Sequence, residues 1–127
     1  MSSKKVSCET NAIPIPSLDF IAGVVETHGS FYVQKIGRSR VSHFRIKIHM
    51  DEAKLLEAIS TKLGLGGTVY RYRHGGRKYA MLVVRRKNEI VDKLIPALDG
   101  RLLGSKRKEY EKWRNRFYKR DLLKRIS

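Results

Sequence analysis

The chain contains a single cysteine, Cys8, among its 127 residues. One thiol cannot form an internal disulfide, and without a second cysteine it cannot belong to a thiolate zinc cluster. This composition suits a reducing compartment. The chain also lacks an apolar run approaching the roughly 18 residues that a membrane-spanning helix requires. We therefore expect a protein that depends on no disulfide and does not associate with a membrane.

Residues 1–16 lack the apolar stretch of a secretion signal and the arginine-rich amphipathic pattern of a transit peptide. They are polar, include two lysines and end in Ile13-Pro14-Ile15-Pro16. We interpret them as a flexible N-terminal arm, and residues 17–127 as a single domain, because a chain of this length builds one core comfortably but not two. The expected location is the cytoplasm of a prokaryote or an organelle that encodes the protein, such as a chloroplast or mitochondrion, and not outside the cell.

Acidic residues are scarce beside basic ones. Asp and Glu total 12 against 28 Lys and Arg, which gives a net charge of +16 at pH 7. A compact domain with this charge repels itself unless a polyanion neutralises it. Nucleic acid is the usual polyanion, because each phosphate contact releases a condensed counterion. A ribosomal-type RNA-binding factor, or a charge excess that only aids solubility, has a similar composition, so charge alone does not decide between these alternatives.

Hydrophobic periodicity predicts the element order α-β-β-α-β-β-α-α. The expected first helix is capped by Ser17, runs to about Thr27 and stops at Gly29 in a left-handed conformation. The other expected elements are strands at 30–36 and 41–48, a helix at 52–63 capped by Asp51, strands at 68–73 and 77–85, and helices at 88–98 and 106–126. Hairpin-linked strands favour a four-stranded antiparallel sheet with helices on one face, which is an α+β fold.

The strand at 41–48 alternates between apolar and basic residues. Phe44, Ile46 and Ile48 fall on one face, whereas His43, Arg45 and Lys47 fall on the other. Alternating basic residues are often no more than a solvated face. Here they recur on several strands, which favours a binding surface. In the last helix, Tyr110, Trp113 and Phe117 have the spacing of residues that pack into a core, and we expect them there rather than stacked on bases.

Residues 21–31, which read Ile-Ala-Gly-Val-Val-Glu-Thr-His-Gly-Ser-Phe, resemble the LAGLIDADG motif followed by its usual Ser-Phe. Residues 46–56 and 95–107 resemble later segments of the same family, and the resemblance extends over about residues 17–118. The chain is thus similar to LAGLIDADG homing endonucleases of the single-motif, homodimeric type. The resemblance implies a saddle-shaped sheet that binds the major groove of double-stranded DNA, and cleavage of a near-palindromic target with Mg²⁺ or Mn²⁺.

The resemblance also assigns positions in this chain. Motif helices of the family pair across a two-fold axis, which implies a dimer interface at Ile21, Ala22, Gly23 and Val25, although the same residues could pack inside one subunit. The expected DNA contacts lie on the strands and hairpin turns: Tyr32, Gln34, Arg38, Arg40, His43, Arg45, Lys47, Arg71, Arg73, Arg77 and Lys78. Arg can pair with guanine and Gln with adenine. Lys106, Arg107 and Lys108 are expected to contact phosphates.

The catalytic positions depart from the family pattern at one residue. The family places a metal-binding carboxylate just before the final glycine of the motif, where this chain has His28, followed by Gly29 as a further candidate ligand. Neutral imidazole is a poor ligand for magnesium, which prefers oxygen. Three alternatives remain open: a catalytically inactive relative, a His28 that acts with a softer metal or as a general base, or a local distortion that brings Glu26 to the metal.

His49, at the end of the second expected strand, matches a polar residue that positions water in the family. Lys87, or alternatively Arg86, matches a lysine near the scissile phosphate. Two functions are therefore predicted. The first is a homing endonuclease with activity weakened or lost through His28. The second is a non-cleaving module on the same scaffold, which binds DNA or, like a maturase, intron RNA.

Overall fold

The structure is a computed structural model that describes residues 14–66 and 68–126, with side chains described to Phe117. The expected flexible arm lies outside the described residues except for 14–16, and so does Cys8. In chain order the elements are α2 (Leu18–His28), β1 (Gly29–Ile36), β2 (Ser39–His49), a 3₁₀ turn (Met50–Glu52), α3 (Ala53–Leu63), β3 (Val69–His74), β4 (Arg77–Val84), α4 (Lys87–Glu89), a π turn (Ile90–Leu94), α5 (Ile95–Leu98) and α6 (Ser105–Ile126). The expected α+β class is confirmed.

Helix α2 begins where the sequence predicts. The Ser17 hydroxyl accepts a hydrogen bond from the Phe20 N–H at 3.1 Å, and Ile21, Ala22 and Val25 are buried. The expected left-handed end at Gly29 is wrong, because its φ of −89° and ψ of 158° are extended. Glycine is needed there for space, since a Cβ would lie 2.8 Å from the carbonyl oxygen of Val25. The chain thus passes directly from α2 into β1.

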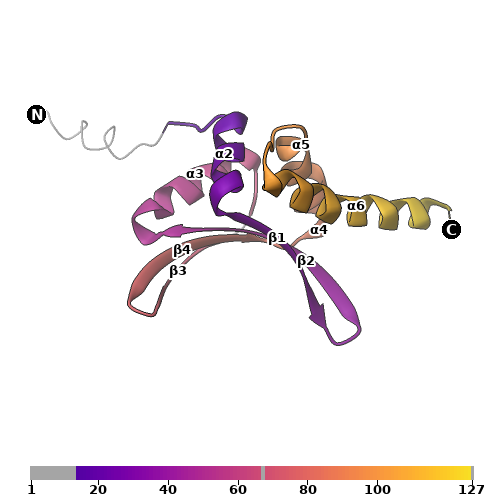
Figure 1. Ribbon diagram of the computed structural model, residues 1–127, viewed down its shortest axis with the longest axis horizontal. Coiled ribbons are helices and arrows are strands. Elements are labelled where there is room, and N and C mark those ends of the chain that lie inside the picture. Colours follow the sequence, from indigo (N-terminus) through magenta and orange to yellow (C-terminus); the bar gives the residue numbers. More distant parts are fainter. Residues whose placement is uncertain (1–13, 67, 127) are drawn as a thin grey trace, which may run out of the picture.

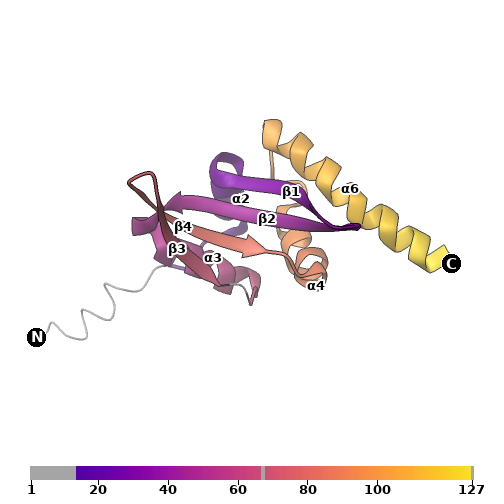
Figure 2. The ribbon, with the colours of Figure 1, turned by 90° about the horizontal axis from the view of Figure 1, so that it is seen from below.

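The four strands form one antiparallel sheet in the order β1-β2-β4-β3. Helices cover only one face of this sheet, which curves away from them like an arch, with the β1–β2 and β3–β4 hairpins descending on its two sides (Figure 1). Seen from below, the four strands lie uncovered (Figure 2). This uncovered concave face is called the open face below.

The core lies between the sheet and the helices. Phe44, Ile46 and Leu82 are fully buried there. The Phe31 ring packs 5.2 Å from the ring of Tyr110 and 5.0 Å from that of Trp113, measured between ring centroids. The predicted packing of the last helix through its aromatic residues is therefore confirmed. No helix among residues 14–66 and 68–126 is long and apolar enough to cross a membrane.

Two helices differ from their expected form. Asp51 does not cap the second helix: its own N–H donates to Nδ1 of His49 at 3.1 Å, and a 3₁₀ turn precedes α3. The expected helix at 88–98 is divided by a π turn at Ile90–Leu94. Pro96, at the start of α5, has no N–H to donate and its ring crowds the carbonyl one turn earlier, so a wider turn precedes it.

Candidate nucleic-acid interface

The open face carries the side chains that alternate with the core residues of β1 and β2. Since Phe31 pairs with the buried Phe44, the neighbouring pair of Tyr32 and His43 points to the open side. Arg45 and Lys47 continue that row along β2, opposite Val83 and Met81 of β4. The predicted separation of basic from apolar residues on β2 is confirmed.

Arg71 and Arg73 lie on the opposite side of the sheet from the one expected. Arg71 pairs with the fully buried Ala80 and its Nη2 donates to the Glu57 carboxylate of α3 at 3.0 Å. Arg73 shares its face and pairs with Lys78. Because Val69 pairs with the buried Leu82, the odd-numbered residues of β3 face the helices, and the open side of β3 carries Tyr70 and Tyr72 instead. Alternation predicted that the two arginines share a face, but not which face.

His43 forms the centre of a cluster on the open face. Its ring stacks on Tyr32 with centroids 4.8 Å apart, and the Arg45 guanidinium lies 5.2 Å from the centre of the same tyrosine ring. His43 is only 4% exposed, and neither ring nitrogen has a hydrogen-bond partner within the described part of the chain. Burial lowers the pKa of His43 below its usual value, and the charges of Arg85 and Arg45 lower it further. The ring is therefore held neutral beside two cations.

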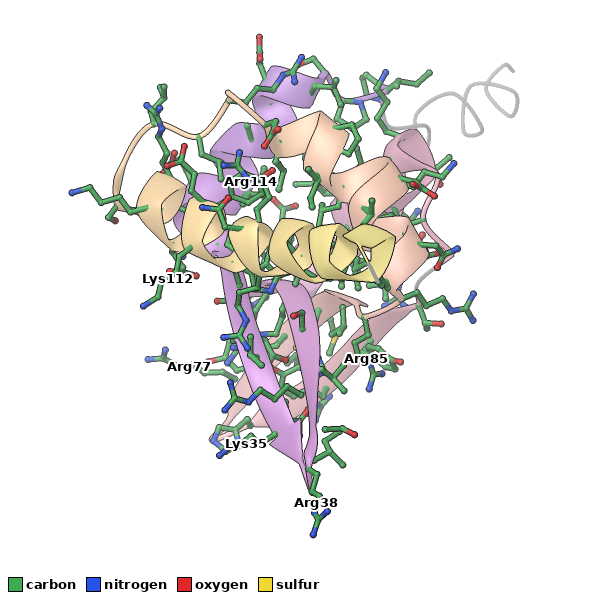
Figure 3. All side chains as sticks on the ribbon, turned by 90° about the vertical axis from the view of Figure 1, so that its right-hand side faces the viewer. Lys35, Arg38, Arg77, Arg85, Lys112 and Arg114 are labelled. Atoms are coloured by element: carbon green, nitrogen blue, oxygen red, sulfur yellow. The ribbon has the colours of Figure 1, made fainter. Side chains whose placement is uncertain are left out.

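Basic side chains also lie at the hairpin ends and along the flanks of the sheet. Lys35 and Arg38 lie at the tip of the β1–β2 hairpin, and Arg77 and Arg85 lie on opposite flanks of the sheet (Figure 3). Gln34 is exposed on the open side of β1, whereas Arg40, paired with Lys35, is exposed with the opposite orientation. Lys112 of α6, which sequence reasoning did not select, lines a hollow at the edge of β1 beside Tyr32.

His28 ends α2 at the edge of the open face. It lines one hollow together with His49, Asp51, Lys47, Arg77, Lys78 and Tyr79. Thr27 Oγ1 lies 2.8 Å from Nδ1 of His28 and 3.2 Å from the carbonyl oxygens of Gly23 and Val24. When that hydroxyl donates its single proton to a carbonyl, it must accept from the Nδ1–H of His28. The Nε2 atom then carries a lone pair.

In His49 the two ring nitrogens have the opposite hydrogen-bonding roles from those in His28. Its Nδ1 accepts the N–H of Asp51, so a neutral ring carries its proton on Nε2 and can donate to a phosphate oxygen. The Asp51 carboxylate lies 3.5 Å from the same Nδ1. Sequence reasoning considered Asp51 only as a helix cap and Thr27 only as the end of the first helix. The hollow thus offers an acceptor on His28, a donor on His49, the Asp51 carboxylate and the basic side chains of Lys47, Arg77 and Lys78.

Glu26 does not take part in this hollow. Its Oε1 accepts the N–H groups of Leu103 and Gly104, the latter at 3.1 Å, in the link before α6. The alternative in which a local distortion brings Glu26 to the metal is therefore contradicted, because the N–H groups of Leu103 and Gly104 hold its carboxylate. The carbonyl of Gly29 is also engaged, because it accepts the ammonium of Lys106 at 2.7 Å. An ammonium at this oxygen opposes its use as a ligand for a cation, and Lys106 itself is turned inward rather than toward phosphates.

These donors do not fit a magnesium ion. Among the residues that the structure describes, no group of three or more His, Cys, Asp or Glu side chains is placed to hold a metal. Asp51 is the one carboxylate lining this hollow, and Glu52 lines a second hollow that His28 and His49 share. The imidazoles between these two carboxylates are ligands for softer ions. Nor do Arg86 and Lys87 line this hollow. They follow the end of β4 where Val84 pairs with Phe44, several residues from the pair of Tyr79 and His49.

The expected interface residues divide into two groups. Ile21, Ala22 and Val25 are buried within the subunit, at 0%, 3% and 0% exposure, so they pack inside it. Gly23 is exposed, and a Cβ added to it would meet no atom within 4 Å. The exposed side of α2 is formed by Phe20, which is 49% exposed, together with Gly23 and Thr27. We call these three residues the α2 stripe.

A curved antiparallel sheet with helices on its convex side and a basic open face defines a saddle-type α+β protein. Residues 21–117 match the sequence profile described as LAGLIDADG endonuclease, and the chain belongs to this family. No curated protein matches the chain.

Several solved structures share the fold. The structure of the LAGLIDADG homing endonuclease I-GzeII in complex with its DNA target superposes with a TM-score of 0.78 at 23% identity, over 92% of this chain and 40% of that one. The structure of the meganuclease I-SmaMI bound to uncleaveable DNA superposes with a TM-score of 0.71 at 23% identity, over 93% of this chain and 45% of that one. The homing endonuclease I-TnaI superposes with a TM-score of 0.73 at 20% identity, over 88% of this chain and 78% of that one. The chain therefore spans less than half the length of the first two proteins.

Proposed function

We propose that this protein is a site-specific DNA-binding protein of the homing-endonuclease type, and that two copies form the unit that binds a near-palindromic duplex. The observation that carries the proposal is the open face itself. It is concave, it is framed by Lys35, Arg38, Arg77 and Arg85, and it carries Arg45 and Lys47 along β2. Basic side chains on a concave face match the phosphates beside a groove of the duplex, and those between them can reach base edges.

The α2 stripe supports the pairing of two copies. A helix with a glycine on its exposed side lets a second backbone approach closely, and Phe20 supplies an apolar contact beside it. An isologous contact places two identical open faces side by side, which matches a target with two-fold symmetry. The solved relatives I-GzeII and I-SmaMI are more than twice as long as the part that this chain matches, so a second unit of similar size would complete their architecture.

Cleavage of the bound duplex is the second part of the proposal. We expect His28 to reduce this activity, because it stands where the family has a metal-binding carboxylate. Its imidazole brings no negative charge to the hollow, and Glu26 is held by the backbone of Leu103 and Gly104. Little or no hydrolysis in Mg²⁺ is expected from the chain as it stands. The His28→Asp variant places a carboxylate at the end of α2, where the ligand for a hard cation is missing.

The experiment measures binding and cleavage separately on one randomised duplex library, with Mg²⁺ and with Mn²⁺. Tight duplex selection with cleavage only by His28→Asp supports an endonuclease scaffold that lacks its acid. Cleavage by the unchanged chain with Mn²⁺ alone supports a role for His28 with a softer ion. Failure to prefer duplex DNA over other polyanions at physiological salt contradicts the whole proposal, and sedimentation of the chain as a monomer on DNA contradicts its dimeric part.

The second candidate is a non-cleaving module on the same scaffold that binds DNA or, in the manner of a maturase, intron RNA. The donor set at the hollow favours it, since His28, His49 and Asp51 do not form a metal site in the described chain. It is supported if neither the unchanged chain nor His28→Asp cuts while nucleic-acid binding stays tight. Competition between duplex DNA and a structured RNA then separates its two forms.

A further inference from the structure

The two hairpins present chemically different surfaces on the open face. On β1–β2 the open side carries hydrogen-bonding groups, among them Gln34, His43 and Arg45. On β3–β4 it carries Tyr70, Tyr72, Tyr79, Met81 and Val83, because Arg71 and Arg73 point toward the helices, and the pair of His74 and Arg77 follows at the hairpin end. The middle of the β3–β4 half is therefore aromatic and apolar where the sequence suggested Arg71 and Arg73, and its basic residues lie at the hairpin end.

The three tyrosines, Tyr70, Tyr72 and Tyr79, are named here the tyrosine cluster. Tyr72 pairs with Tyr79 across the strands, with ring centroids 5.4 Å apart, and Tyr70 pairs with Met81. Lys47 extends from β2 so that its Nζ lies 4.3 Å from the centre of the Tyr79 ring. Tyr70 is 43% exposed and the other members are half-buried. The cluster leaves apolar area uncovered on a face that is charged around its rim.

Uncovered apolar area on a DNA-binding surface requires an apolar partner to gain free energy on binding. The major groove presents donors and acceptors on every base pair, but its one apolar group is the 5-methyl of thymine. Phosphates flanking the groove match Arg77 and Lys78 at the end of the same hairpin. The chemistry of the β3–β4 half therefore suits a segment of duplex rich in thymine.

We propose that the tyrosine cluster, with Met81, recognises thymine methyl groups, so that each half of the target has one segment read through hydrogen bonds by β1–β2 and one thymine-rich segment read by β3–β4. This inference rests on the proposed function, since it names the kind of sequence that the open face selects. It makes Tyr70, Tyr72 and Tyr79 specificity-determining residues.

The test replaces thymine by deoxyuridine, which removes a methyl group and keeps every Watson–Crick and groove hydrogen bond. Duplexes are first selected from a randomised library, and each thymine of the selected site is then replaced singly. Binding is measured by fluorescence anisotropy at fixed salt. At positions under β3–β4 we expect about fourfold weaker binding for each methyl removed, the factor that corresponds to one buried CH₂ group. Replacement at other positions leaves affinity unchanged.

Variants of the tyrosine cluster test whether it causes the loss of affinity seen with deoxyuridine. In Tyr72→Ala the loss caused by deoxyuridine disappears at the affected positions, because the partner of the methyl is already missing. Tyr72→Phe keeps the ring and is expected to keep the loss, which separates apolar contact from hydrogen bonding by the hydroxyl. Arg45→Gln is the matched control on the other hairpin, and it weakens binding while leaving the deoxyuridine effect unchanged.

Each failure has a different meaning. Tight duplex binding with no effect of deoxyuridine at any position overturns this inference and leaves the proposed function standing. A preference for single-stranded oligonucleotides that is lost in Tyr70→Ala and Tyr72→Ala also overturns it, and shows instead that the cluster stacks on unpaired bases. Absence of binding to any duplex overturns the inference and the proposed function together.

Discussion

The Glu26 carboxylate ties the motif helix to the segment that leads into α6, and its removal gives the sharpest test of the structure. In Glu26→Ala the N–H groups of Leu103 and Gly104 lose a shared charged acceptor. A hydrogen bond to a charged group contributes about 1.5–3 kcal/mol. Water replaces part of this loss, because Leu103 is 83% exposed and Gly104 is exposed. We expect the loss of these two hydrogen bonds to lower the free energy of unfolding by about 2 kcal/mol.

The assay is urea unfolding followed by the fluorescence of Trp113, which is buried beside Phe31. Thermal unfolding should show a midpoint lower by about 8 °C, at roughly 4 °C per kcal/mol for a domain of this size. Glu26→Gln keeps a carbonyl acceptor and should lose about half as much. The exposed Glu52 supplies a control, since Glu52→Ala should change stability by less than about 0.5 kcal/mol. Unchanged stability of Glu26→Ala would refute the structural role. If adding Glu26→Ala to His28→Asp also abolished the cleavage gained in His28→Asp, Glu26 would be assigned to the chemistry.

Four further outcomes are expected. His28→Asp should raise cleavage of the selected duplex in Mg²⁺ from undetectable to measurable, with unchanged affinity. The pKa of His43 is lowered by burial and neighbouring arginines. The unfolded chain therefore binds more protons below about pH 6.5, and the free energy of unfolding decreases as the pH is lowered, by up to about 1.4 kcal/mol per pH unit. His43→Gln should flatten this decrease in urea titrations at several pH values. Gly23→Arg should gain up to about 1 kcal/mol of helix stability yet sediment as a monomer. Arg71→Ala should cost less than about 1 kcal/mol of stability and leave DNA affinity unchanged, whereas Arg45→Ala should weaken binding by about 1–3 kcal/mol.

Much of the fold followed from local patterns. Ser17 caps α2 as predicted, and the alternation of Phe44 and Ile46 with Arg45 places the core and open sides of β2 correctly. The error on β3 shows the limit of such patterns. Alternation assigns residues of a strand to two sides, but the side that meets the core depends on pairing, here that of Arg71 with Ala80.

The candidate site was less predictable, because it joins residues from separate elements. Sequence likeness selected His28 and His49, and both line the same hollow. It also selected Lys87, which lies outside that hollow since the register of β2 and β4 places the start of α4 further along the sheet. The role of Glu26 was not visible either, because its partners are backbone groups 77 and 78 residues later.

Charge, periodicity and the motif by themselves determined a basic α+β domain of one family, since these properties depend on composition and on neighbours along the chain. Tertiary structure alone decided which residues of α2 face outward, where Glu26 is held, and that tyrosines rather than arginines occupy the open side of β3. The physical reason is the same in each case. A side chain's orientation depends on which distant segment its element packs against, and that packing is a property of the whole folded chain.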